Sequence, residues 1–309
     1  MKREEIFRKI LVPVDGSLHS LIAEELTASI AKKLNSKVTV LHVVSHELMI
    51  PERHEHVAQG VTGSGQFPIE RHVSTSTASS LPEAVTSEIT SWFHQKGEQV
   101  IAEAVGLFQE EGIPVDQKIV HHANPAEAII KEAQVGKYDV IIMGSRGEEE
   151  EGKESHLGSV AQRASRHSHI PVLIAREKRQ ISRILVPVDG SRNAEKALQY
   201  AILLAKKTNA KITLLYVQES SLFKLRPEVT KQIGTHILAN AADQADEMKL
   251  DQKLEFGDPG KMITRTASEG DYDIIVMGSH GHGAIERFLL GSVSDHVIHY
   301  ANRSVLIIK

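Results

Sequence analysis

The sequence contains one pattern twice. The run Ile10-Leu-Val-Pro-Val-Asp-Gly-Ser17 returns as Ile184-Leu-Val-Pro-Val-Asp-Gly-Ser191, which is 174 positions later (184 minus 10). Further along each copy, Tyr138-Asp-Val-Ile-Ile-Met-Gly-Ser145 returns as Tyr272-Asp-Ile-Ile-Val-Met-Gly-Ser279, which is 134 positions later (272 minus 138). The chain is therefore an internal duplication. Its 309 residues give each copy enough length to bury a core of its own.

The first copy is longer than the second between the two repeated motifs. The difference between the two shifts (174 minus 134) is 40 residues, and most of the excess falls at about 46–80, where apolar residues show little periodicity. Such a segment is typical of a disordered or loosely packed excursion, and a partner-binding loop is the alternative. We predict one unit at residues 1–177, which carries this insertion, and a second unit at 178–309.

Short apolar runs alternate with amphipathic stretches in each copy, which is typical of an α/β fold with a parallel sheet. The strands predicted in the second copy are Ile184–Val188, Ile212–Val217, Lys253–Phe256, Ile274–Met277 and Val305–Ile308. A helix is predicted over Ala194–Lys207, and a following helix should bury the face that carries Val229, Ile233, Ile237 and Ala241. Pro13 and Pro187 cannot donate a ladder hydrogen bond, so we expect them at strand ends.

In the first copy, a helix that begins at Pro82 should bury one side, which includes Trp92. The two copies are joined by a charged linker at Arg176–Arg183. Such a short tether holds the copies at a high effective concentration. It therefore predicts that they pack as a pseudo-symmetric pair.

A glycine motif follows the fourth predicted strand of the second copy. It reads Gly278-Ser-His-Gly281, and Gly291-Ser292 comes after nine further residues. The order strand, glycine loop and helix start suits an anion such as phosphate, which could meet exposed backbone amides and the hydroxyls of Ser292 and Ser294. The same residues could equally be a loop and an N-cap with no ligand.

Composition excludes several classes of function. The formal net charge of -4 offers no basic face for nucleic acid, so we expect no nucleic-acid partner. The first residues lack an apolar signal core and no apolar run approaches about 18 residues, so we expect a cytoplasmic protein without a membrane segment. The absence of cysteine excludes disulfides, thiolate catalysis and thiolate metal sites.

The pair of motifs, Val-Pro-Val-Asp-Gly-Ser and Gly-x2-Gly-x9-Gly-Ser, resembles the universal stress protein family, and two copies in one chain resemble its tandem form. The resemblance implies a five-stranded parallel sheet of the nucleotide-binding, Rossmann-like type in each copy. It also implies that the copies pair through their last strands. The implied function is a stress-response sensor or regulator that binds ATP, with Mg²⁺, in the second copy and acts on an unknown protein partner.

The resemblance also implies a set of site residues, because the second copy matches the family's motif in full. The implied residues are Pro187, Val188, Asp189, Val217, Met277, Gly278, Ser279, Gly281, His282, Gly291, Ser292, Val293 and Ser294. Within this set, Asp189 would accept a hydrogen bond from the adenine amino group. An Asx-turn beside Gly190 is its alternative role.

The first copy departs from this motif. Gly144-Ser-Arg-Gly147 is followed by ten residues before Gly158-Ser159, and those ten include four consecutive glutamates, Glu148–Glu151. Four carboxylates near a triphosphate would repel it, so we expect weak or no ATP binding here and a structural role for Asp15. Glutamates that simply point to solvent are the alternative.

Neither a metal site nor a catalytic group is apparent in the sequence. Histidine pairs occur at His54/His56, His121/His122, His167/His169 and His280/His282, but none has carboxylates at ligand spacing, so we predict no metal ligands. No residue constellation supplies an obvious general base. A slow ATPase or self-phosphorylating enzyme using Ser292 or Ser294, and a scaffold that binds no nucleotide, remain the alternatives. Homodimer formation is left open.

Overall fold

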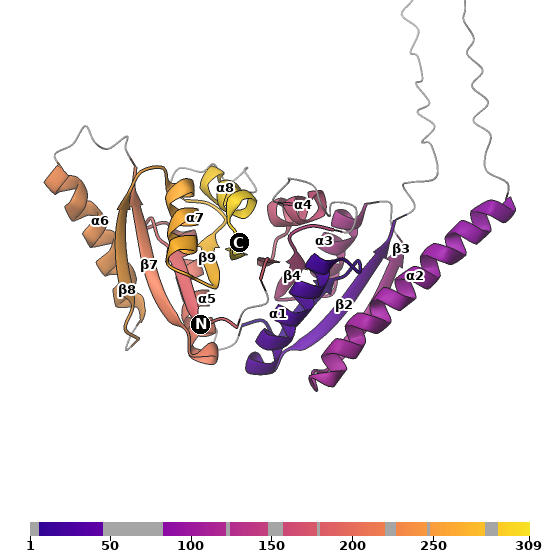
Figure 1. Ribbon diagram of the computed structural model, residues 1–309. Coiled ribbons are helices and arrows are strands. Elements are labelled where there is room, and N and C mark those ends of the chain that lie inside the picture. Colours follow the sequence, from indigo (N-terminus) through magenta and orange to yellow (C-terminus); the bar gives the residue numbers. More distant parts are fainter. Residues whose placement is uncertain are drawn as a thin grey trace, which may run out of the picture.

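The computed structural model describes residues 6–45, 83–121, 124–147, 157–177, 180–219, 227–245, 248–281 and 290–309 (Figure 1). The predictions about the insertion at 46–80, Glu148–Glu151 and His282 lie outside these residues.

The strands are β1 Lys9–Pro13, β2 Lys37–Val44, β3 Val115–His121, β4 Val140–Gly144, β5 Val172–Ala175, β6 Arg183–Pro187, β7 Lys211–Gln218, β8 Asp251–Phe256, β9 Ile274–Gly278 and β10 Ser304–Ile308. The helices are α1 Leu18–Leu34, α2 Glu83–Glu110, α3 Pro125–Val135, α4 Ser159–His167, α5 Arg192–Thr208, α6 Pro227–Ala242, the 3₁₀ turn η3 Asp243–Ala245, α7 Pro259–Glu269 and α8 Ser292–Tyr300.

All ten strands form one sheet, in the order β3-β2-β1-β4-β5-β10-β9-β6-β7-β8. Within each copy the neighbouring strands are parallel, which confirms the predicted fold class. The two copies meet where β5 and β10 pair antiparallel, with Leu173 opposite Leu306. Because the five strands of each copy are parallel, all five carboxyl ends of a copy lie at one edge of its half of the sheet.

Helices cover both faces of the sheet. Strand residues alternate between the two layers. Ile10 belongs to the buried cluster that includes residues of α1, α2, α5 and α6, whereas Leu11 belongs to the cluster that includes residues of α3, α4, α7 and α8. Ile10 of the first copy and Ile184 of the second belong to the same buried cluster. The apolar core is therefore continuous from one copy to the other.

Corresponding residues in the two copies mark the end of the first strand and the start of the first helix. Ser17 and Ser191 accept a hydrogen bond from the backbone of the first turn of α1 and α5 and so act as N-caps. Pro13 and Pro187 are the last residues of β1 and β6, as predicted. Each proline therefore ends its strand, and the backbone N–H of the next residue, Val14 or Val188, still donates to the neighbouring strand.

The prediction that Trp92 is a core residue is wrong. Its side chain is 57% exposed, although Val100, Ala104 and Phe108 further along α2 are buried as predicted. The 28 residues of α2 span about 42 Å, whereas the eight residues of the neighbouring strand β2 span about 26 Å. The first turns of α2 therefore extend beyond the strands of the described part of the sheet (Figure 1).

The predicted buried face of α6 is only partly correct, because Ala241 is buried and Ile237 packs against the core, but the two residues nearer the start of the helix are not buried. Val229 and Ile233 are 42% and 38% exposed, while Thr230 and Leu238 are buried. A side chain at Gly234 would collide with Tyr216 and Leu254, so this glycine is where α6 comes closest to the sheet. In the first half of α6 the buried stripe therefore runs through a threonine and a glycine, and hydrophobicity alone points to the wrong side of that half.

None of the helices in the described ranges is both long enough and apolar enough to cross a membrane.

Candidate functional site

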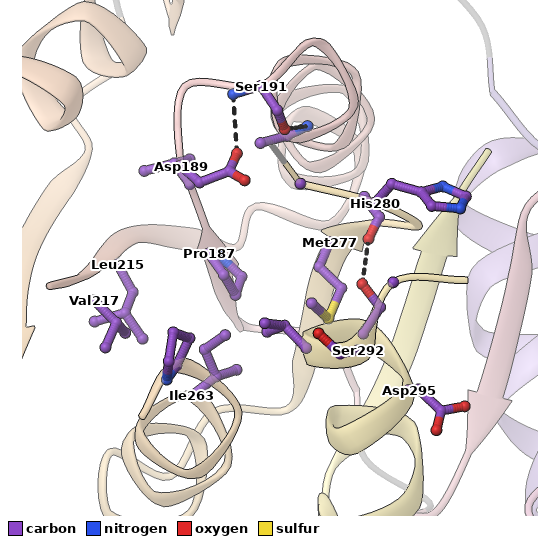
Figure 2. A pocket seen from close by; sticks show the side chains of 18 of the residues that line it. Pro187, Asp189, Ser191, Leu215, Val217, Ile263, Met277, His280, Ser292 and Asp295 are labelled. Atoms are coloured by element: carbon purple, nitrogen blue, oxygen red, sulfur yellow. Dashed lines mark hydrogen bonds between the residues drawn. The ribbon is translucent and has the colours of Figure 1, made fainter. Parts of the chain in front are cut away.

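A cavity of about 870 Å³ opens in the second copy, at the carboxyl ends of β6, β7 and β9 and beside the start of α8 (Figure 2). This is the point where the strand order reverses, at which open α/β sheets bind ligands. The predicted residues that line it are Pro187, Val188, Asp189, Val217, Met277, Gly278, Gly281, Gly291, Ser292, Val293 and Ser294. The structure thus brings together residues more than one hundred positions apart in the sequence.

Two of the predicted serines have structural hydrogen bonds. Ser279 does not line the cavity: its side chain is buried, its backbone N–H donates to Ile308, and its carbonyl accepts from Gly291. Ser294 lines the cavity but is also buried, and its hydroxyl donates to the carbonyl oxygen of Gly278 at 2.8 Å. These bonds hold the start of α8 against the end of β9.

Asp189 forms the Asx-turn that the sequence analysis gave as its alternative role. Its Oδ1 accepts a hydrogen bond from the backbone N–H of Ser191 at 2.9 Å (Figure 2). Its Oδ2 faces Gly281, where a Cβ would collide with it. One carboxylate oxygen therefore holds the loop before α5, and the other lies against the glycine loop at the cavity.

The three glycines of the motif are needed for different reasons. A Cβ on Gly278 would lie 2.7 Å from the carbonyl carbon of Asn193, so this glycine lets the end of β9 pack against the start of α5. A Cβ on Gly281 would instead meet a side chain at the cavity. A Cβ on Gly291 would be 3.3 Å from the carbonyl oxygen of Ser279, a tight but less severe approach.

Helix α8 presents its N-terminus to the cavity. Its N-cap is Gly291, which supplies no capping side chain, and Ser292 is exposed at the first helical position. The first amides of an α-helix have no acceptor within the helix, and the helix dipole places partial positive charge on them. This end of the cavity can therefore accept an anionic group.

The opposite side of the cavity is apolar and includes residues that the sequence analysis missed. Leu215 and Tyr216 come from β7, and Pro259 and Ile263 come from the start of α7. Figure 2 shows Leu215, Val217 and Ile263 on the side away from Asp295. Position at the carboxyl end of a strand, or at the start of the next helix, was the signal that could have identified them.

Two ionisable side chains that line the cavity, Tyr216 and His280, have shifted pKa values. Burial raises the pKa of Tyr216, and the negative charges of Asp189 and Glu219 raise it further. The phenol therefore stays neutral, and it can donate a hydrogen bond at ordinary pH. In the glycine loop, burial and the positive charge of Lys309 lower the pKa of His280, so its imidazole is mostly neutral.

One lining residue comes from the other copy. Arg166, on α4, reaches the cavity and binds Asp295 on α8. Sequence analysis missed this residue, because a motif within the second copy carries no signal for a side chain supplied by the first.

The first copy contains a smaller cavity of about 490 Å³ at the equivalent place. Asp15 makes the same Asx-turn, with Oδ1 accepting from Ser17, and a Cβ on Gly147 would lie 2.7 Å from its Oδ2. Phe93 and Lys96 from the long helix α2 also line this cavity. The geometry of the loop is therefore retained, while the walls differ.

In the part of the chain that the structure describes, no three histidine or carboxylate side chains are grouped so that they could hold a metal ion. The nitrogen Nδ1 of His280 lies 2.9 Å from the hydroxyl of Ser279. One of the two ring nitrogens through which His280 could bind a metal ion thus lies beside a hydroxyl group.

Comparison with known proteins identifies the family. The model of the universal stress protein family matches residues 6–62, 71–176 and 180–309. The universal stress protein Slr1230 of Synechocystis is 27% identical over 302 residues, which cover 97% of this chain and 99% of the relative. A putative universal stress protein of Staphylococcus aureus is 33% identical over 137 residues, which cover 41% of this chain and 82% of the relative.

Solved structures agree at the level of the fold. The crystal structure of a universal stress protein from Archaeoglobus fulgidus matches with a TM-score of 0.67 and 24% identity, and it covers 98% of both chains. Matches to the family model lie in both copies and together span nearly the whole chain. The chain therefore belongs to the universal stress protein family, in its tandem form.

Proposed function

We propose that this protein is a cytoplasmic regulator of the stress response that binds ATP, with Mg²⁺, in the cavity of its second copy. Occupancy of the cavity would be read by a protein partner. The observation that carries the proposal is the assembly of Gly278, Gly281, Gly291 and Ser292 around one cavity at the switch point of the sheet.

The residues around the cavity fit the three parts of ATP. The apolar side at Val217 and Ile263 suits the adenine ring, and the carboxylate of Asp189 can accept from its amino group. The uncapped start of α8 and the exposed hydroxyl of Ser292 suit the phosphates. Bound Mg²⁺ would reduce the charge of the phosphates. The sum of these features favours a nucleotide over a wholly apolar ligand.

A binding role is favoured over an enzymatic one. The hydroxyl of Ser294, one of the two possible phosphate acceptors, is buried and donates to the carbonyl of Gly278. The other, Ser292, is exposed. Among the described cavity residues we find no carboxylate or imidazole hydrogen-bonded to the Ser292 hydroxyl, and a general base has to lie within hydrogen-bond reach of the proton it removes.

The test is isothermal titration with ATP and Mg²⁺, after any co-purified nucleotide has been extracted and identified by mass. We expect one site per chain, lost in Gly281→Val because the new side chain would collide with Asp189. The matched control is Gly147→Val, which introduces the same collision with Asp15 in the first copy and should leave the measured site intact.

Two results would contradict the proposal. One is an unchanged affinity in a folded Gly281→Val variant, which would place the nucleotide elsewhere. The other is the absence of both binding and co-purified nucleotide, which would favour the nucleotide-independent scaffold. Release of ADP or phosphate during the titration would instead favour the slow ATPase.

A further inference from the structure

Helices α4 and α8 face each other across the join between the copies (Figure 1). A shift of 133 (292 minus 159) superimposes their sequences, so Gln162 corresponds to Asp295 and Arg166 corresponds to His299. Two contacts related by the pseudo-twofold axis connect them. In one, Nε2 of Gln162 lies 3.1 Å from Nε2 of His299. In the other, Arg166 donates to Oδ1 of Asp295 from Nε at 3.0 Å and from Nη2 at 2.8 Å.

The two contacts differ in chemistry and in position. The contact of Gln162 involves an amide and an imidazole, and neither residue lines either of the two cavities described above. Arg166 and Asp295 are an ion pair, and both line the cavity of the second copy. Their side chains are 43% and 31% exposed, so the pair is open to a ligand rather than sealed in the join. Of the two symmetry-related contacts, the one at the second copy's cavity is therefore an ion pair, and the other is a contact between uncharged polar groups.

Arg166 changes the charge balance of this cavity. The described residues that line it include three carboxylates, those of Asp189, Glu219 and Asp295. Among the described residues on its wall, Arg166 supplies the one guanidinium and is the one residue contributed by the first copy. Asp295 lies in the first turn of α8, the same turn whose amides face the cavity. Without Arg166, its carboxylate would oppose any anion bound there.

We infer that Arg166 is a specificity residue of the second copy's nucleotide site, supplied by the first copy. This inference rests on the proposed function. Arg166 neutralises Asp295 at the start of α8 and adds attraction for phosphate groups, so it favours ligands with several phosphates over those with one or none. The complete site then requires both copies, which gives the tandem arrangement a role in ligand selection.

The test compares ATP, ADP, AMP and adenosine by isothermal titration at fixed Mg²⁺ and salt. In Arg166→Gln we expect ATP to bind about five- to tenfold more weakly, ADP to lose less, and adenosine to bind as it does to the wild type. Asp295→Asn should strengthen ATP binding. The double variant Arg166→Gln/Asp295→Asn has the same net charge at this point as the wild type, so its affinity for ATP should return close to the wild-type value.

Gln162→Ala is the matched control, since it removes the symmetry-related contact without altering a cavity residue. It should leave all four affinities unchanged. An equal loss for all four ligands in Arg166→Gln, or a similar loss in Gln162→Ala, would show a merely structural role and overturn the inference. ATP binding by the wild type with no change in Arg166→Gln would overturn the inference alone. Failure of the wild type to bind any of the four would refute the proposed function and the inference together.

Discussion

Gly278→Ala should destabilise the protein through the packing of its backbone rather than through its ligand. The added Cβ would lie 2.7 Å from the carbonyl carbon and 2.8 Å from the carbonyl oxygen of Asn193, whereas ordinary van der Waals contact begins at 3.4 Å. Asn193 is in the first turn of α5, which is held by the buried Ala194, Ala197 and Leu198. Either β9 or α5 must therefore move as a unit.

Overpacking of this kind costs about 1–3 kcal/mol. If the 309 residues unfold as one unit, the usual unfolding entropy per residue gives about 0.65 kcal/mol for each degree. The expected fall in the midpoint of thermal unfolding is therefore about 2–5 °C. Circular dichroism in the far ultraviolet measures it directly, with no ligand present.

Two other glycines supply the controls. In the first copy, a Cβ on Gly144 would lie 2.6 Å from the carbonyl carbon of His19, so Gly144→Ala should lower the midpoint by a similar amount. At Gly291 the nearest atom would be 3.3 Å away, so Gly291→Ala should lower it less. A midpoint that is unchanged in Gly278→Ala, or that falls as far in Gly291→Ala, would refute the reasoning.

Two further predictions concern charge. Burial raises the pKa of the Glu24 carboxyl, although a hydrogen bond from Ser20 opposes the shift. The protonated carboxyl therefore stabilises the folded state fully below the unfolded pKa of about 4.5, and this contribution is lost as the pH rises through the raised folded value. Glu24→Gln should therefore raise the midpoint of thermal unfolding near neutral pH and not near pH 4.5, and an equal effect at both would contradict this explanation. Replacement of Glu148–Glu151 by a neutral loop should strengthen ATP binding to the first copy by up to about thirtyfold, measured in a Gly281→Val background. If calorimetry shows no gain, repulsion between these glutamates and the phosphates does not weaken binding.

The fold could be predicted largely because the same pattern of strands and turns occurs in both copies of the sequence. A buried strand such as Ile184–Val188 is ambiguous alone, but its copy at Ile10–Val14 and the flanking Asp-Gly-Ser turn leave one interpretation. The strand–loop–helix order around Gly278 also fixed which residues would meet at the carboxyl edge of the sheet. Most of the cavity could therefore be anticipated from one copy.

Features that depend on how elements lie against one another could not be predicted. The exposed Trp92 follows from the length of α2 relative to the strands beneath it, and hydrophobicity does not record that difference. The buried face of α6 passes through Gly234, where the side chains of Tyr216 and Leu254 occupy the space that a side chain on α6 would need. Arg166 enters the second cavity from the first copy, so its place depends on the pairing of β5 with β10.

The second cavity is connected to the first copy at two adjacent residues of α4. Ser279 in the glycine loop donates its backbone N–H to Ile308 at the end of β10, and the next residue, Lys309, donates from Nζ to the carbonyl oxygen of Ser165 at 2.5 Å. Arg166 follows Ser165 and binds Asp295 in the first turn of α8. Of the two elements that would hold phosphate, α8 thus contacts the last turn of α4 directly, and the glycine loop is linked to it through the end of β10. A shift of α8 or of the glycine loop would therefore act on the last turn of α4, at the join between the two copies.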